Sequence, residues 1–320
     1  MIFQILSFAI SCFVLALLSK SLVKTLVQVA RYLNWREFMV GFFVMAFATS
    51  LPNLFVDVNA ALHGFPQLAF GDIVGGNLVD LTLVMALAVL FSKKGISTKS
   101  SMVQTSAIFT AIIAFLPLLL ILDGNLSRTD GVILLLAFFL YAFWIFSKQE
   151  NYQKIYNETK KEKNAMNPFW FLKNVAKLVF LLALLVATSF VVVDTAQFFA
   201  NTLGASLALV GILIVGLGNC FPEAYFSIIS AKKGEGWMVL GDLMGSVIVC
   251  ATLVLGIVAL ISPFQIVDFS PFIIARIFVF VAAIFYLFAI KSDKKITKKE
   301  ALLLLFTYIA FLLTEIFLPK

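Results

Sequence analysis

Apolar runs of about 20 residues recur along the whole chain of 320 residues. A run of that length crosses the hydrocarbon core of a bilayer when it forms an α-helix. Hydrophobic residues make up 62% of the chain and charged residues only 13%, whereas soluble domains carry about 25% charged residues. The sequence therefore predicts an all-α polytopic membrane protein. The net charge of +7 does not indicate a nucleic-acid partner, because the lysines lie in short connections between apolar runs.

Ten membrane-spanning segments are predicted. They run over residues 3–31, 37–62, 67–91, 103–122, 130–147, 172–200, 206–231, 237–261, 271–290 and 299–318. The stretch 148–170 contains the only long polar connection, and it separates two sets of five segments. We expect residues 1–147 and 171–320 to form two five-helix repeats, joined by a polar loop at 148–170.

Basic residues are concentrated in every second connection. These connections hold Arg31, Arg36, Lys93, Lys94, Lys99, Lys148, Lys154, Lys160, Lys161, Lys163, Lys232, Lys233, Lys291, Lys294, Lys295, Lys298 and Lys299. The other side holds little beyond Arg128 and Lys320. Cytoplasmic connections carry the excess of lysine and arginine in membrane proteins. The pattern predicts a plasma (cytoplasmic) membrane protein with both termini outside and the 148–170 loop in the cytoplasm.

The two halves of the chain align without a gap when one is shifted by 170 residues. The shift superposes glycine, proline and aspartate at fixed offsets: Pro52 on Pro222, Gly71 on Gly241, Asp72 on Asp242, and Gly75 on Gly245. Because each repeat has an odd number of segments, the two copies enter the membrane in opposite orientations. Inverted repeats of this kind are typical of secondary transporters, whose binding site lies at the midplane between the repeats.

Pro52 and Pro222 fall inside apolar runs, beside polar residues. Proline interrupts the helical hydrogen-bond ladder, and irregular backbone at membrane depth is tolerated where it is buried in protein or lines a wet cavity. We expect helices 2, 3, 7 and 8 to be broken, so that freed carbonyls and hydroxyls face an ion. Asp72 and Asp242 lie in G-D-x-x-G patterns at residues 71–75 and 241–245. We interpret these glycines as turn signals and expect the two aspartates to cap half-helix N-termini.

Two segments resemble a known family. They are FATSLPNLFVDVNAALHGFPQLAFGDIVGGNLVD and GLGNCFPEAYFSIISAKKGEGWMVLGDLMGSVIVC. Both resemble the α-repeats of the calcium/cation antiporters, whose pattern is close to G-T-S-L-P-E followed by G-N-x-x-G-S-N-x-x-[ND]. The resemblance implies a sodium/calcium exchanger-like membrane protein built from two such repeats.

The resemblance also implies a set of ion ligands. In the first repeat the matched positions are Thr49, Ser50, Asn53, Gly76 and Asp80; in the second they are Asn219, Cys220, Glu223, Ser246 and Cys250. Three departures stand out, because Asn53 replaces a glutamate, Gly76 lacks a hydroxyl, and Cys250 replaces a carboxylate or amide.

A charge near the bilayer centre costs roughly 2.5–3.5 kcal/mol on insertion scales, so each buried carboxylate requires a reason. Glu223 directly follows the breaking proline, and Asp80 lies well inside an apolar segment. Both are expected to bind the ion. Asp57 lies one helical turn after Asn53 on the same face. It either replaces the missing glutamate or lies in a wetter vestibule, and the sequence leaves both open.

Carboxylate, amide, hydroxyl and carbonyl oxygens suit hard cations such as Ca²⁺ or Na⁺. The leading hypothesis is a secondary antiporter that exchanges Ca²⁺ for Na⁺ by alternating access. Exchange of Ca²⁺ for H⁺ stays open, and Cys220 and Cys250 leave open a softer metal such as Zn²⁺. A cation channel is the alternative class. The sequence contains no HExxH, GxSxG or nucleotide-binding loop, so neither an enzyme nor a cofactor is expected. The expected partners are lipid and the transported cations, with no obligate protein partner.

Overall fold

The computed structural model describes residues 1–32, 45–147, 168–266, 270–292 and 294–317. Within these ranges, nine helices are long and apolar enough to cross a membrane. The predicted segment 37–62 is represented by its described part, Met45–Leu62, which is helical on both sides of a break. Most of the polar connection predicted at 148–170 lies outside the described residues, and its last three residues belong to a helix that starts at Pro168.

The helices and strands follow the repeat. The first half contains α1 (Ile2–Tyr32), α3 (Met45–Thr49), α4 (Leu51–Leu62), α5 (Pro66–Val79), η2 (Asp80–Val84), α6 (Met85–Phe91), β1 (Ile96–Ser97), α7 (Ser101–Leu120), η3 (Ile121–Asp123), β2 (Asn125–Leu126) and α8 (Arg128–Ser147). The second half contains α9 (Pro168–Leu203), α10 (Leu207–Val210), η5 (Gly211–Val215), α11 (Gly216–Asn219), α12 (Phe221–Lys233), α13 (Gly236–Ile248), η6 (Val249–Val254), α14 (Leu255–Ile261), β3 (Phe264–Gln265), α15 (Ser270–Lys291), β4 (Lys295–Ile296) and α16 (Lys298–Phe317).

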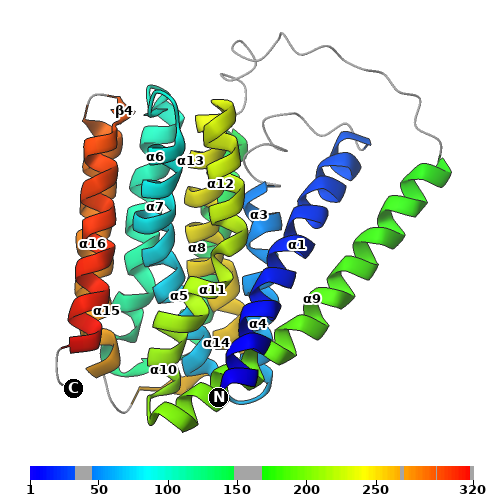
Figure 1. Ribbon diagram of the computed structural model, residues 1–320, viewed down its shortest axis with the longest axis vertical. Helices are drawn as coiled ribbons and strands as arrows, with labels where there is room; N and C mark the ends of the chain where they lie inside the picture. The colour runs from blue at the N-terminus through cyan, green and yellow to red at the C-terminus, as the bar shows by residue number, and fades with distance from the viewer. Residues whose placement is uncertain (33–44, 148–167, 267–269, 293, 318–320) are drawn as a thin grey trace.

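The long helices α1 and α9 pack against each other at the outside of the bundle and run in opposite directions (Figure 1). Both expose large apolar side chains, including Phe13 and Phe180, as expected of helices that face lipid. By contrast, the helices α5–α6 and α13–α14 are mostly buried. The polar residues that the sequence singles out are therefore carried by the inner helices and by the short helices that pack on them.

Two short irregular stretches interrupt the spanning helices. Ser50 separates α3 from α4, and Cys220 separates α11 from α12. In each case the proline lies in the first turn of the following helix, where its missing N–H is tolerated. Since proline has no N–H to donate, the carbonyls of Ala48 and Gly218 receive no helical hydrogen bond from it. The breaks expected in the second and seventh predicted segments, 37–62 and 206–231, are present.

The breaks expected in the third and eighth predicted segments, 67–91 and 237–261, are absent, and that prediction was wrong. Each of these helices continues from its first turn to its last, through a π-helical turn at η2 or η6. Neither contains a proline in its interior, so nothing forces the ladder to open. One turn instead widens to i→i+5 bonding, and it begins at Asp80 in the first half and at Val249 in the second.

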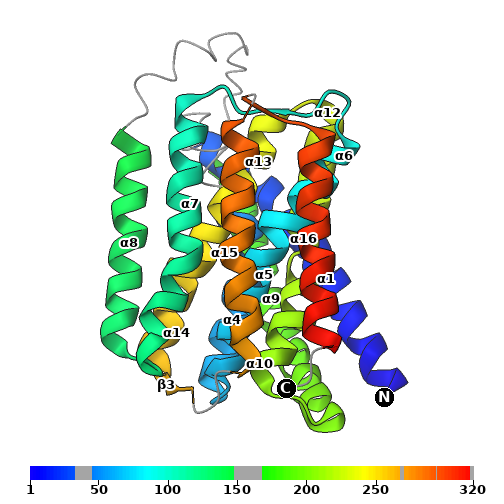
Figure 2. The same ribbon diagram turned by 90° about the vertical axis from the view of Figure 1, so that its left-hand side faces the viewer.

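Two small antiparallel ribbons join loops that are far apart in the sequence. Strand β1 pairs with β4, and β2 pairs with β3. Shifting β4 back by 170 residues gives β2, and shifting β3 back gives residues 94–95, next to β1. The two ribbons are thus equivalent under the repeat. Strand β4 lies at one end of the bundle (Figure 1) and β3 at the other (Figure 2).

Helix α5 crosses the span formed by α10, η5 and α11, and glycines lie at the crossing. A Cβ atom added to Gly71 would strike the backbone of Ala208, and one added to Gly75 would strike the backbone of Ile212. On the facing helix, a Cβ on Gly216 would come within 2.8 Å of the Gly76 nitrogen. These glycines permit close approach of backbones, as small residues do in other membrane helices.

We predict that Gly75→Ala lowers the thermal stability of the purified protein, because the new methyl group meets backbone that cannot move aside. Overpacking of this kind costs about 1–3 kcal/mol. The neighbouring Gly76→Ala is the matched control, since its Cβ would meet nothing nearer than the Cys220 sulfur at 3.5 Å. Melting curves in detergent compare the two variants, and equal melting temperatures would contradict the close crossing.

Candidate cation site

Each half of the protein donates a hydrogen bond from its broken helix to an aspartate of the other half. Thr49 Oγ1 donates to Asp242 Oδ1 at 2.8 Å, and Asn219 Nδ2 donates to Asp72 Oδ2 at 2.6 Å. Thr49 and Asn219 are equivalent under the 170-residue shift, and so are the two aspartates. The repeat thus places two equivalent polar contacts where the halves meet.

These contacts correct the expectation that Asp72 and Asp242 cap half-helices. Both lie inside continuous helices, α5 and α13, and neither is at an N-terminus. Both are buried. Asp242 Oδ2 also accepts a hydrogen bond from Ser227 Oγ at 3.3 Å. Their carboxylates are held by side chains on neighbouring helices instead of backbone N–H groups.

A second set of contacts surrounds Glu223 and Asp80. Ser246 Oγ donates to Glu223 Oε1 at 3.3 Å, and Glu223 is fully buried. Asp80, at the start of the π-helical turn η2, lies beside Ser246 and Cys220. The structure therefore brings together the two carboxylates that the sequence singles out, although they are 143 residues apart in the chain.

The cysteines of the second half contact the first half. Asn53 Nδ2 donates to Cys250 Sγ at 3.4 Å, and Cys220 Sγ donates to the Gly76 carbonyl at 3.6 Å. Both thiols are buried, and both are free cysteines. Gly76 leaves room for this contact, because it has no side chain where the family pattern has a serine.

The hydroxyls before Pro52 contact their own helix. Ser50 Oγ donates to the Ala46 carbonyl at 2.8 Å, and Thr49 Oγ1 lies 3.1 Å from the same carbonyl. Both residues are buried. A hydroxyl that donates its hydrogen retains lone pairs. Both oxygens therefore remain able to accept a cation.

Several buried oxygen atoms receive no hydrogen bond from any described residue. Six of them belong to predicted ligands: Asn53 Oδ1, both carboxylate oxygens of Asp57, Asp80 Oδ1, Asn219 Oδ1 and Glu223 Oε2. A buried polar atom without a partner costs about 1–3 kcal/mol, and a charged one costs more. Six acceptor atoms without donors, on five residues that the sequence had predicted as ligands, form an environment that a cation would stabilise.

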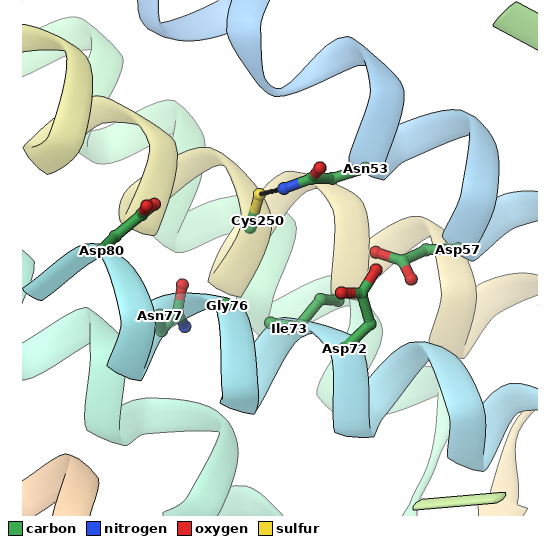
Figure 3. A pocket seen from close by; sticks show the side chains of 8 residues that line it. All are labelled: Asn53, Asp57, Asp72, Ile73, Gly76, Asn77, Asp80 and Cys250. Atoms are coloured by element: carbon green, nitrogen blue, oxygen red, sulfur yellow. Dashed lines mark hydrogen bonds between the residues drawn. The ribbon is translucent and has the colours of Figure 1, made fainter. Parts of the chain in front are cut away.

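A small cavity joins part of this set. Its volume is about 10 Å³, and it is lined by Asn53, Asp57, Asp72, Ile73, Gly76, Asn77, Asp80 and Cys250 (Figure 3). None of the described residues that line it is basic. Glu223 is not among them, but it lies within electrostatic range of Asp80.

The side chain of Asp57 is fully buried and lines the cavity together with Asn53 and Asp80. Its role as a replacement for the missing glutamate stays a prediction, as does the alternative of a wetter vestibule. Asn77 also lines the cavity, and sequence reasoning missed it. Helical spacing could have predicted it, because Asn77 precedes Asp80 by three residues and therefore lies on the same face of the helix.

Among the described residues, no group of three or more histidine, cysteine, aspartate or glutamate side chains is placed to hold a metal ion by itself. A cation here would have to take hydroxyl, amide or backbone oxygens in addition to carboxylates. Such mixed oxygen sets are characteristic of Ca²⁺ and other hard cations.

The model of the sodium/calcium exchanger protein family matches residues 3–147 and 173–317, which together are most of the chain. The chain belongs to this family. It is similar to the sodium/calcium exchanger MaX1 of Methanosarcina acetivorans, with 24% identity over 324 residues, covering 91% of this chain and 92% of that protein. It is also similar to the inner membrane protein YrbG of Escherichia coli, with 29% identity over 236 residues, covering 71% and 70% of the two chains.

A solved structure of the sodium-calcium exchanger NCX_Mj, soaked with Na⁺ and Sr²⁺, has a similar fold. The TM-score is 0.65 and the identity 25%, with 97% of this chain and 98% of that chain covered. The resemblance seen in the two repeated segments is therefore confirmed. The protein is an integral membrane protein of a cation exchanger family, with two family repeats, and it is a transporter instead of an enzyme.

Proposed function

We propose that the protein is a secondary active antiporter that exchanges Ca²⁺ for Na⁺. The observation that carries the proposal is the layer of buried oxygen acceptors without donors at the contact between the two halves. Buried acceptors without donors lower the stability of the folded protein, and a bound cation would remove that cost. Their presence is therefore better explained by cation binding than by a contribution to folding. The family of the chain and its likeness to the exchangers MaX1 and NCX_Mj support the same function.

In this proposal Glu223 and Asp80 supply the charge that binds the divalent ion. Oxygen atoms from Asn53, Asn219, Ser246, Thr49 and Ser50 complete its shell. Ca²⁺ takes six to eight oxygens, which requires such neutral ligands as well as carboxylates. Cys250 lines the cavity where the family pattern has a carboxylate or amide, and Cys220 lies close by. These thiols are the specific reason to test a softer divalent metal beside Ca²⁺.

We further propose that the repeats are inverted and that the halves rock against each other to expose the layer to one side at a time. Three observations support this. The helices α1 and α9 run in opposite directions, the equivalent ribbons lie at opposite ends of the bundle, and the cross-contacts of Asp72 and Asp242 are equivalent. With the excess of basic residues in the cytoplasm, both termini would lie outside the plasma membrane.

Transport by the purified protein in proteoliposomes tests the function. Vesicles loaded with Na⁺ and diluted into Na⁺-free buffer should take up Ca²⁺ with a rate that saturates, since each ion must occupy a buried site. Vesicles with equal Na⁺ on both sides are the control. Uptake that does not saturate and needs no counter-cation would indicate a channel. Uptake driven only by a pH gradient would replace Na⁺ with H⁺, and a preference for Zn²⁺ would replace Ca²⁺.

A further inference from the structure

Asp57 breaks the equivalence of the two halves. Its counterpart under the 170-residue shift is Ser227, and the counterpart of Asp72 is Asp242. In the second half, Ser227 Oγ donates a hydrogen bond to Asp242 Oδ2 at 3.3 Å. In the first half the hydroxyl is replaced by a carboxylate, so two acidic side chains meet where the other half has a donor and an acceptor.

The carboxyl groups of Asp57 and Asp72 face each other between α4 and α5 (Figure 3). Asp57 is 0% exposed and Asp72 is 2% exposed, and both line the cavity. Neither oxygen of Asp57 receives a hydrogen bond from the described residues. Asp72 accepts one, from the amide of Asn219 at 2.6 Å. The amide is the one neutral donor seen at this pair, and no basic side chain lines the cavity among the described residues.

Two facing carboxylates in a low-dielectric interior repel each other, and a buried charge without a partner is strongly destabilising. A cation between them removes both penalties at once. The pair is also separate from the Asp80 region, because Asp72 and Asp80 are eight residues apart on one helix, about 12 Å along its axis. One cation cannot be bound by both residues.

We propose that Asp57 and Asp72 form a second cation site, which binds one Na⁺ independently of the Asp80–Glu223 site. This inference rests on the function proposed above and adds a ligand pair to it. The oxygen supply favours a monovalent ion. Asp57 offers two oxygens, and Asp72 offers the one not bonded to Asn219. Three side-chain oxygens are fewer than the six to eight that Ca²⁺ takes.

Replacement of Asp57 by serine is the sharpest test, because Asp57→Ser copies the arrangement that the second half already contains. Equilibrium binding of radioactive Na⁺ to the purified protein should fall by one ion per chain. The affinity for radioactive Ca²⁺ should change by less than about threefold, since the two sites are too far apart to couple strongly. Asp72→Asn should give the same loss of one Na⁺ per chain. It provides a second, independent measurement if one of the two variants does not fold.

The control is Asp194→Asn, which removes an exposed carboxylate of the spanning helix α9. It should bind as much Na⁺ as the unaltered protein. An unchanged Na⁺ count in folded Asp57→Ser and Asp72→Asn proteins would overturn the second site, and would mean that the two carboxyls share a proton. A loss of Ca²⁺ affinity above about tenfold with an unchanged Na⁺ count would overturn it too, by placing the pair in the divalent site. Should the unaltered protein fail to exchange Ca²⁺ for Na⁺ while the Na⁺ count still falls, the proposed function is wrong and the second site stands.

Discussion

Replacing Glu223 by glutamine is expected to abolish Na⁺-driven Ca²⁺ transport while the protein still folds. Glu223 is fully buried and directly follows Pro222, which lies at the break between α11 and α12. One of its oxygens accepts a hydrogen bond from Ser246, and the other receives none from the described residues. Glutamine has the same shape and can still accept from Ser246, but it removes the negative charge. The substitution therefore spares the packing and removes the attraction for a divalent ion.

Initial rates of Ca²⁺ uptake into Na⁺-loaded proteoliposomes measure the effect. Size-exclusion profiles and melting curves establish that the variant is folded. Glu235→Gln is the matched control, because Glu235 lies in the turn between α12 and α13, directly before α13 begins, and is partly exposed. Its rate should match that of the unaltered protein. Near-normal uptake by a folded Glu223→Gln protein would remove Glu223 from the site.

Asp80→Asn is expected to weaken Ca²⁺ binding far more than Asn53→Ala does. Asp80 supplies a buried charge with one oxygen that no described residue bonds. Losing the charged partner of a buried ion costs about 3–5 kcal/mol. Asn53 supplies a neutral oxygen, and its amide donates a hydrogen bond to the Cys250 sulfur. Loss of one neutral ligand costs about 1 kcal/mol.

Titration calorimetry with Ca²⁺ on the two purified variants compares these losses directly. Each 1.4 kcal/mol is a factor of ten in the dissociation constant, so the variants should differ by more than about tenfold. Equal and mild effects would show that the charge of Asp80 is not used. A larger effect from Asn53→Ala would move the centre of the site toward Asn53 and Cys250.

The sequence predicted the helices and their breaks where proline chemistry acts. The predicted segments 67–91 and 237–261 correspond to the spans Pro66–Phe91 and Gly236–Ile261. The ends of these helices could be predicted because the hydrocarbon core of the bilayer requires a continuous run of about 20 apolar residues. The false breaks in helices 3 and 8 came from reading glycine as a turn signal. In α5, Gly71 and Gly75 instead admit the backbone of a neighbouring helix.

For the candidate site, the sequence named candidate residues, but it did not predict the contacts between them. The repeat and the two motifs pointed to Asp80, Glu223 and Ser246, which do lie together. Helical spacing reports which face a residue occupies, but it does not report which helix packs on that face. The contacts of Asp72 with Asn219 and of Thr49 with Asp242 cross from one half to the other, so they required the fold.

A crystal structure with Sr²⁺ as a heavy substitute for Ca²⁺ tests the central claim most directly, because anomalous scattering locates the ion without assumption. At low Na⁺, a single strong peak should lie at direct coordination distance from oxygens of both Glu223 and Asp80, slightly longer than the about 2.3–2.6 Å of Ca²⁺ because Sr²⁺ is the larger ion. Raising Na⁺ in the same crystal form should remove that peak, since the two cations compete for one layer of oxygens. A peak away from Glu223 and Asp80, or a peak that persists unchanged at high Na⁺, would contradict the account.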